Sequence, residues 1–179
     1  MRDYFIVRDV SKMKHGIVYW ITGLSGAGKT TVGSLLFKRL RQQKSGVVLL
    51  DGDVVRKAFG NDLGYTIDDR HEMAMRYSRI SRMLSEQGID VVCCTISMFD
   101  DVRAWNRKNI ARYKEVYLRV PREVLAQRNQ KELYSSALDE LVGFGVAMDE
   151  PKLSDLVLDN DGRYSPQEAV DTIWEELVE

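Results

Sequence analysis

Gly23-Leu24-Ser25-Gly26-Ala27-Gly28-Lys29-Thr30 follows the apolar run Ile17-Val18-Tyr19-Trp20-Ile21, with only Thr22 between them. The octapeptide has the spacing G-x-x-x-x-G-K-[ST], in which glycines let successive backbone N–H groups turn inward on a phosphate chain. Lys29 supplies a mobile positive charge for the outer phosphates, and the Thr30 hydroxyl is suited to ligate Mg²⁺. The motif predicts that the chain binds a nucleoside triphosphate, with ATP and Mg²⁺ as the expected cofactors. The residues predicted to bind ATP here are Gly23, Ser25, Gly26, Ala27, Gly28, Lys29, Thr30 and Thr31.

Around this motif, apolar runs typical of strands alternate with amphipathic segments typical of helices. That alternation predicts an α/β fold, a P-loop NTPase-type parallel sheet with helices on both faces. We expect strands over 17–22, 46–51, 89–96, 114–120 and 154–159, and helices over 29–43, 68–87, 102–112, 121–131 and 165–178. The 179 residues suffice for one compact domain and are too few for two ordinary ones. We therefore expect an N-terminal extension over 1–16 and a single kinase domain over 17–179.

Two local patterns refine this expectation. Met73, Tyr77, Ile80 and Leu84 recur at three- and four-residue steps, which predicts one apolar helix stripe facing the sheet. Ser165, Pro166 and Glu168 have the spacing of a helix start, with Ser165 as N-cap. Cys93 and Cys94 are adjacent in an apolar run, where neighbouring strand side chains face opposite ways, so we expect two reduced core thiols.

Charge and hydropathy exclude several classes of partner. The chain has 26 basic and 27 acidic residues, so its global balance does not favour nucleic acid or an anionic membrane surface. No apolar run approaches the ~20 residues needed to span a bilayer, and the N-terminus lacks the apolar region of a secretion signal. We expect a cytoplasmic protein that recognises its partners through local charge.

A second motif separates the chain from other P-loop proteins. The apolar run Val47-Val48-Leu49-Leu50 ends in Asp51-Gly52-Asp53, with Arg56 three residues later. Two carboxylates at this edge can hold Mg²⁺, directly or through water, or accept the proton of an attacking hydroxyl, and an arginine can bind an anionic acceptor. The alternative interpretation is a turn that caps the next helix, with Asp53 at its N-terminus. Beside a complete phosphate loop we favour catalysis, with Lys29, Asp51 and Asp53 as catalytic residues and Thr30 and Asp51 at the metal.

With these motifs the chain resembles the adenylylsulfate kinase family, which phosphorylates the 3′-hydroxyl of adenosine 5′-phosphosulfate with ATP. The matching blocks are Gly-Leu-Ser-Gly-Ala-Gly-Lys-Thr-Thr (23–31), Leu-Asp-Gly-Asp-x-Val-Arg (50–56), Asp-Leu-Gly-Tyr-Thr-x-x-Asp-Arg (62–70), Ile-Ser (96–97) with Arg103 and Arg107 downstream, and Lys-x-Leu-Tyr (131–134). The resemblance implies that Arg56 and Arg70 bind the phosphosulfate. It also implies that Tyr65 and Phe144 surround the acceptor's base, and that Asp51 and Asp53 serve the metal and the hydroxyl in an order left open.

The resemblance extends to three further positions. Ser97 stands at the serine of the family's Ile-Ser-Pro segment, where it either contacts the acceptor or caps a helix. Arg128 and Lys131 precede a stretch at about 132–153 that forms a mobile lid in the family. There Arg128 is expected to bind ATP and Lys131 the substrate, or both belong to a solvated helix face. Family members often form dimers, so a homodimer is also an expectation.

Departures from the family pattern cluster on the acceptor side. Met73 and Met75 replace the usual Asn and Arg, and the lid reads Lys131-Glu132-Leu133-Tyr134-Ser135-Ser136, with fewer cations than usual. Each lost hydrogen bond to a charged group would weaken binding of a phosphosulfate acceptor by about 1.5–3 kcal/mol. Either new contacts compensate for this loss, or the acceptor is a different molecule. Adenosine 5′-phosphosulfate is the leading acceptor. The alternative is cytidine diphosphoramidate, the substrate of a related kinase in bacterial capsule modification, and a second alternative is an ATP-binding regulatory module.

Overall fold

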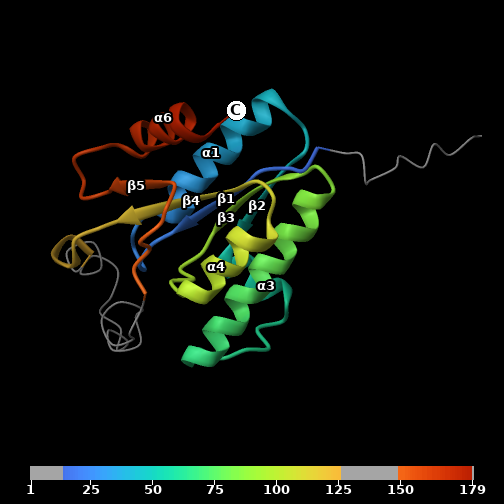
Figure 1. Cartoon of the computed structure of the whole chain (residues 1–179). Helices are drawn as coiled ribbons and strands as arrows, with labels where there is room; N and C mark the ends of the chain where they lie inside the picture. Colours follow the sequence, from blue (N-terminus) through green and yellow to red (C-terminus); the bar gives the residue numbers. More distant parts are fainter. Residues whose placement is uncertain (1–13, 126–148, 179) are drawn as a thin grey trace, which may run out of the picture.

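The computed structural model describes residues 14–125 and 149–178, and within them five parallel strands form one sheet (Figure 1). The strands lie in the order β2-β3-β1-β4-β5. Their bounds are Val18–Thr22 for β1, Val47–Asp51 for β2, Asp90–Cys94 for β3, Tyr113–Arg119 for β4 and Leu156–Asp159 for β5. The strand order steps outward from β1 in both directions, which creates a crevice at the carboxyl ends of the central strands.

The central strand β1 is apolar because both of its faces are covered. All five of its residues are buried, and Val18 pairs with Val91 of β3 on one side and with Tyr113 of β4 on the other. A strand buried on both faces reads as a continuous apolar run rather than an alternating one. The run that precedes the phosphate loop is therefore the middle of the sheet, and this places the loop at the middle of its carboxyl edge.

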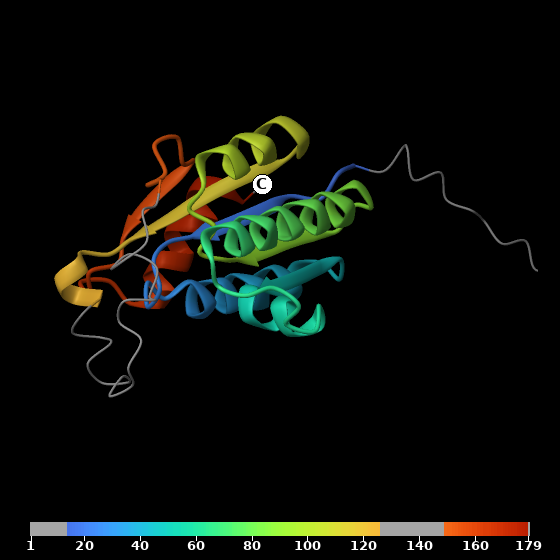
Figure 2. The ribbon, with the colours of Figure 1, turned by 90° about the horizontal axis from the view of Figure 1, so that it is seen from below.

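Helices cover the two faces in pairs (Figures 1 and 2). One layer holds α1 (Lys29–Gln43) and α6 (Pro166–Leu177), whose Leu36 and Ile173 lie in one buried cluster. The other layer holds α3 (Ile67–Glu86) and α4 (Asp100–Asn109), which pack with Trp20 of β1 in a second cluster. The short helix α2 (Gly52–Ala58) follows β2 directly. The predicted α/β fold with helices on both faces of a parallel sheet is confirmed.

The local predictions for helices and thiols are also confirmed. The Ser165 hydroxyl accepts a hydrogen bond from the Glu168 N–H, and the Glu168 carboxylate accepts one from the Ser165 N–H, which is a capping box. Met73 and Tyr77 of the predicted stripe are buried against the sheet. Cys93 and Cys94 are free, buried thiols that point into the two different clusters.

Several elements differ from the sequence prediction. The helix α2 was not among the predicted helices, and its N-cap is Asp51 rather than Asp53. The strand β3 ends at Cys94 instead of 96, and the positive φ of 25° at Ser97 follows three residues later. The helix predicted over 102–112 spans Asp100–Asn109. Most of the helix predicted over 121–131 and most of the predicted lid segment lie outside the described residues. No helix in the described part of the chain is long and apolar enough to cross a membrane.

Candidate active site

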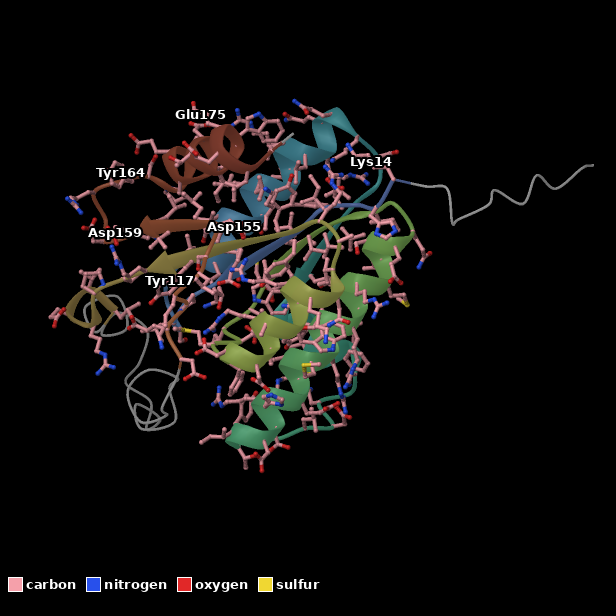
Figure 3. The ribbon with its side chains drawn as sticks, in the orientation of Figure 1. Lys14, Tyr117, Asp155, Asp159, Tyr164 and Glu175 are labelled. Carbon is pink, nitrogen blue, oxygen red and sulfur yellow. The ribbon has the colours of Figure 1, made fainter. Side chains whose placement is uncertain are left out.

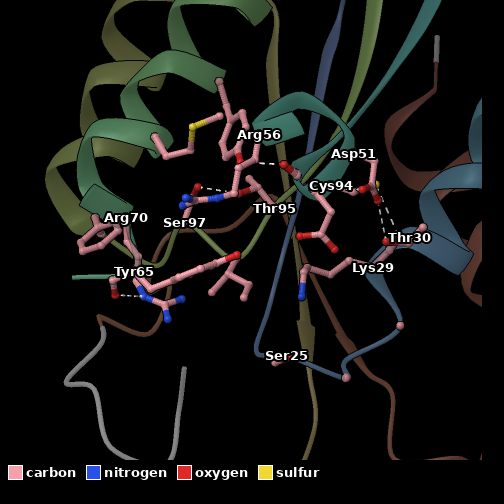
Figure 4. A pocket seen from close by; sticks show the side chains of 18 of the residues that line it. Ser25, Lys29, Thr30, Asp51, Arg56, Tyr65, Arg70, Cys94, Thr95 and Ser97 are labelled. Carbon is pink, nitrogen blue, oxygen red and sulfur yellow. Dashed lines mark hydrogen bonds between the residues drawn. The ribbon is translucent and has the colours of Figure 1, made fainter. Parts of the chain in front are cut away.

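A pocket of about 360 Å³ opens at the carboxyl edge of the sheet, between the phosphate loop and the start of α2 and α3. It combines the ends of β1, β2 and β3, as expected for a ligand site of an open α/β sheet. Figure 4 shows Lys29, Thr30 and Asp51 gathered at one end and Tyr65 and Arg70 at the other. The residues that line it are Ser25, Gly26, Gly28, Lys29, Thr30, Thr31, Asp51, Gly52, Asp53, Arg56, Tyr65, Arg70, Met73, Tyr77, Cys94, Thr95, Ile96, Ser97 and Phe99.

Near its end, at Gly28, the phosphate loop has a backbone conformation that only glycine adopts without strain. Gly28 is the N-cap of α1 and has φ 86°, a left-handed conformation that side chains with a Cβ rarely adopt. Beside it, the Asn160 amide donates a 2.8 Å hydrogen bond to the Ala27 carbonyl. Asn160 directly follows β5, so the far edge of the sheet braces the loop. The backbone N–H groups at the start of α1 are thereby directed at the space where phosphates bind helix N-termini.

Lys29 is half-buried at the floor of this pocket. Its Nζ donates a 2.7 Å hydrogen bond to the Leu24 carbonyl, which folds the side chain back along the loop. Desolvation lowers the pKa of Lys29 to about 8, although the nearby Cys94, Asp53 and Asp51 act in the opposite direction. The ammonium is therefore a poorly solvated charge, and an incoming phosphate provides a better partner than the single carbonyl.

Thr30 and Asp51 form the pair that fits a magnesium ion. The Thr30 hydroxyl donates a 2.7 Å hydrogen bond to Asp51 Oδ2, so both oxygens lie at one point of the pocket. In residues 14–125 and 149–178 no group of three or more His, Cys, Asp or Glu side chains could hold a metal ion. Mg²⁺ usually keeps several waters and takes one or two protein oxygens plus substrate phosphates. The donor set therefore fits Mg²⁺ that arrives with a nucleotide.

The two carboxylates of the Asp-Gly-Asp motif lie in different surroundings. Asp51 Oδ1 accepts from the backbone N–H of Asp53 at 3.1 Å and of Val54 at 3.4 Å, so Asp51 is occupied as the cap of α2 and as the partner of Thr30. Asp53 is exposed to the pocket, and within the described residues no group donates a hydrogen bond to its carboxylate. Asp53 is thus the carboxylate with lone pairs available to an incoming hydroxyl.

Cations surround Tyr65 at the other end of the pocket. The guanidinium carbon of Arg56 lies 4.6 Å from the centre of the Tyr65 ring, and that of Arg70 lies 5.4 Å from it. Arg56 also donates to the carbonyls of Leu63 and Gly64, at 2.8 and 2.9 Å, and Arg70 Nε donates to the Tyr65 carbonyl at 2.7 Å. Tyr65 itself is 65% exposed. The arrangement offers a flat aromatic face flanked by two positive charges.

The third side of the pocket is the segment 95–99, which we call the acceptor wall. Thr95 and Ser97 are buried and joined by a 2.7 Å hydrogen bond between their hydroxyls. Phe99 and Met73 extend this side with apolar surface, and Met73 is only 2% exposed. Tyr77 donates a 2.9 Å hydrogen bond to the Gly52 carbonyl, and burial raises the pKa of its hydroxyl to about 12.

The structure brings most of the predicted site residues into one pocket. Those that line it are Ser25, Gly26, Gly28, Lys29, Thr30, Thr31, Asp51, Asp53, Arg56, Tyr65, Arg70 and Ser97. Gly23 and Ala27 belong to the loop but do not line the pocket, and Arg128, Lys131 and Phe144 lie outside the described residues. The sequence analysis missed Thr95, Phe99 and Asn160. Only their place in the sequence could have indicated these three residues, because each follows the carboxyl end of a strand, where parallel sheets bind ligands.

A protein-family model described as "Adenylylsulphate kinase" matches residues 15–159 of the chain. The chain belongs to the adenylylsulfate kinase family. The match covers the phosphate loop, the Asp-Gly-Asp motif and the acceptor wall. Adenylylsulfate kinases are phosphotransferases that use ATP and act on a hydroxyl acceptor, and this chain is an enzyme of that class.

Relatives within the family carry two different names. A cytidine diphosphoramidate kinase from Campylobacter jejuni is 37% identical over 165 residues, which cover 90% of this chain and 96% of that protein. An adenylyl-sulfate kinase from Halothermothrix orenii is 36% identical over 168 residues, which cover 92% of this chain and 90% of that protein. The solved structure of the Mycobacterium tuberculosis APS kinase in complex with AMPPNP and APS has a TM-score of 0.80 and 30% identity. That similarity covers 92% of this chain and 99% of the solved one.

Proposed function

We propose that the chain transfers the γ-phosphoryl group of Mg·ATP to the 3′-hydroxyl of a small nucleotide acceptor, with adenosine 5′-phosphosulfate as the leading candidate. One observation carries this proposal. A single pocket joins the phosphate loop, through Lys29 and Thr30, to the aromatic face of Tyr65 with its two flanking arginines. Donor and acceptor bound at the two ends would meet at Asp53. A regulatory module that only binds ATP does not need the end of the pocket that Tyr65 and the two arginines form.

The proposed roles follow from the surroundings of each side chain. Lys29 moves from the Leu24 carbonyl to the outer phosphates, and Thr30 and Asp51 hold Mg²⁺, which neutralises phosphate charge when it is bound. Asp53, with no hydrogen-bond donor among the described residues, orients the attacking hydroxyl and accepts its proton. Catalysis then comes mainly from placement and charge neutralisation, because the loose transition state of phosphoryl transfer needs little covalent help.

The acceptor side is proposed on charge and shape. Arg56 and Arg70 bind the anionic group of the acceptor, and Tyr65 stacks on a flat ring system. Ser97 contributes its hydroxyl to the acceptor. Arg128, Lys131 and Phe144 remain proposed ligands of ATP, acceptor and base. We take 17–179 as the kinase domain, and homodimer formation stays a proposal.

Cytidine diphosphoramidate is the second candidate acceptor, and one feature of the pocket favours it. Met73 places a buried thioether on the acceptor side, where the family pattern has a polar Asn. The relative named cytidine diphosphoramidate kinase is 37% identical to this chain over nearly its whole length. A smaller base with a different polar edge would suit this altered side, while the ATP half of the pocket serves either acceptor.

Acceptor-dependent release of ADP tests the proposal. Purified protein is given Mg·ATP with adenosine 5′-phosphosulfate or with cytidine diphosphoramidate, and the phosphorylated position of the product is found by NMR. Saturable turnover with the sulfate compound supports the leading acceptor, and turnover with the cytidine compound alone makes the altered acceptor side the determinant of specificity. Slow ATP hydrolysis that neither compound accelerates would contradict both candidates and favour a regulatory module.

A further inference from the structure

The acceptor wall contains a strained residue. Ser97 is not a glycine, yet its φ is 25°, and it is only 6% exposed. A non-glycine residue with positive φ persists where the surrounding structure determines its conformation, and such residues cluster at functional sites. Contacts on both sides of Ser97 must therefore hold the wall in this shape.

On the near side, the sheet provides these contacts. The backbone N–H of Thr95 donates a 3.1 Å hydrogen bond to the Ile21 carbonyl, and the Thr22 hydroxyl donates to the Ile96 carbonyl. Ile21 and Thr22 belong to β1, and Thr95 and Ile96 follow directly on β3. The residues before Ser97 are thus fixed to the central strand that carries the phosphate loop.

On the far side, the contacts come from Asp149, a residue distant in the sequence. The helix α4 begins at Asp100, and its N-cap residue Phe99 provides no side-chain hydrogen bond. Instead, Asp149 Oδ2 accepts from the Asp100 N–H at 3.2 Å, and the Asp149 N–H donates to the Met98 carbonyl at 3.1 Å. The Asp149 carboxylate therefore acts as the N-cap of α4 and interacts favourably with the helix dipole.

A buried arginine keeps Asp149 in place. Arg103 is 4% exposed, and its Nη2 donates a 2.8 Å hydrogen bond to the Asp149 carbonyl and a further one to the Asp100 carboxylate. Its Nε lies 4.0 Å from the buried carboxylate of Glu115. A buried guanidinium that loses an acceptor carries a large desolvation penalty. Arg103 therefore holds the Asp149 main chain against the start of α4.

We infer that Asp149 is a positioning residue, which fixes Met98–Asp100 and through them the Ser97 turn of the acceptor wall. Among the described residues, the hydrogen bonds of Asp149 run to Met98, Asp100 and Arg103 and not to the phosphate loop, so its effect belongs to the acceptor half of the pocket. The inference rests on the proposed function only in so far as the wall receives the acceptor. Asp149 is itself exposed, so its side chain can be changed without opening the core.

Three variants test this role: Asp149→Ala, Asp149→Asn and the control Glu150→Ala, which removes a neighbouring exposed carboxylate. Amide hydrogen exchange of residues 98–103 is measured first, in the absence of any nucleotide. Loss of a cap changes local stability enough to speed exchange about tenfold in Asp149→Ala. Asp149→Asn, which keeps an acceptor oxygen, should recover most of the protection, and Glu150→Ala should match the parent protein.

Kinetics provide the second readout. For Asp149→Ala we expect the acceptor KM to rise about tenfold while the KM for ATP stays unchanged, since only the acceptor wall loosens. Unchanged exchange at 98–103, or equal effects on both KM values, would overturn the inference. If the parent protein phosphorylates neither acceptor, the proposed function fails on its own, and the exchange comparison still decides whether Asp149 positions the wall.

Discussion

At the scale of single residues, Lys29 is the most informative group, because its pKa links ATP binding to pH. The lysine is charged below its pKa of about 8 and loses its proton as pH rises through that value. Phosphates favour the charged form, so ATP binding raises the pKa and takes up a proton above about pH 8. The affinity for Mg·ATP should therefore be constant below this pH and fall by up to about tenfold for each pH unit above it.

Titration calorimetry at several pH values checks this, and a pair of buffers with different ionisation enthalpies reports the proton uptake directly. Lys29→Met is the matched control, since it removes the titrating group and should bind weakly with no pH dependence near 8. An affinity that stays flat from about pH 7 to about pH 9 in the parent protein would contradict the role given to Lys29.

Asp51 and Asp53 should separate in their effects, because their surroundings differ. Asp53→Asn removes the carboxylate assigned to the hydroxyl and should lower kcat about 10²–10⁴-fold with little change in stability. Asp51→Ala removes the cap of α2 and should lower the free energy of unfolding by about 0.5–2 kcal/mol as well as activity. Steady-state kinetics and thermal unfolding of both variants decide the matter, and a full kcat for Asp53→Asn would be incompatible with the assigned base.

At the scale of elements, the contact between α1 and β3 leaves no room for a methyl group. A Cβ added to Gly33 would overlap the sulfur of Cys94. Overpacking costs about 1–3 kcal/mol, which exceeds the gain of up to about 1 kcal/mol from replacing a glycine inside a helix. Gly33→Ala should therefore lower the free energy of unfolding.

The effect of Gly33→Ala on the free energy of unfolding should change sign when the sulfur of Cys94 is removed. In a Cys94→Ala background the space is free, so adding Gly33→Ala should raise the free energy of unfolding by up to about 1 kcal/mol. Chemical denaturation of the two single variants and the double variant gives the coupling. Additive effects would mean that the sulfur and the methyl group do not compete for one space.

Sequence reasoning succeeded at the scale of elements where the signal is local. The phosphate loop, the apolar stripe through Met73 and Tyr77, and the cap at Ser165 all depend on residues within a few positions of one another. Asp53 was the residue considered as a cap of the next helix, whereas Asp51 has that role, because α2 begins at Gly52 and Asp51 Oδ1 accepts from the N–H groups of Asp53 and Val54. The turn at Ser97 was missed because no local pattern marks a strained serine.

At the scale of the whole molecule, the long-range contacts could not be predicted from the sequence. Asn160 reaches the phosphate loop across 133 positions, and Asp149 reaches α4 across 49. Both side chains are common in loops, and only the strand order brings them to their partners. Motifs indicated most of the residues that line the pocket, but they gave no sign of these two long-range contacts.

Glu115 connects β4, α4 and the segment before β5, so its loss should weaken the whole fold. It is 1% exposed, lies 3.2 Å from Arg107, and accepts hydrogen bonds from Ser154 at 2.9 Å and Tyr113 at 3.0 Å. Removing one partner of a buried ion pair costs about 3–5 kcal/mol, which is the loss we expect in the free energy of unfolding of Glu115→Gln.

The exposed pair Arg119–Asp159 is the matched control, with 2.6 Å between Nε and Oδ1. Figure 3 shows Asp159 at one end of β5 and Asp155, a partner of Arg107, at the other. Because water screens a surface pair, Asp159→Asn should cost less than about 1 kcal/mol in chemical denaturation. Equal losses for Glu115→Gln and Asp159→Asn would show that the buried network does not join the sheet to α4.

The central claim is that one pocket moves a phosphoryl group from ATP to the hydroxyl of a bound nucleotide. Mass spectrometry of the acceptor after a single turnover with Mg·ATP tests it most directly, with Lys29→Ala and Asp53→Ala run beside the parent protein. The account predicts that, in the time the parent protein needs for one turnover, the acceptor gains one phosphoryl group on its sugar with the parent protein and with neither variant. An unmodified acceptor alongside released ADP and inorganic phosphate, or full transfer by either variant, would contradict it.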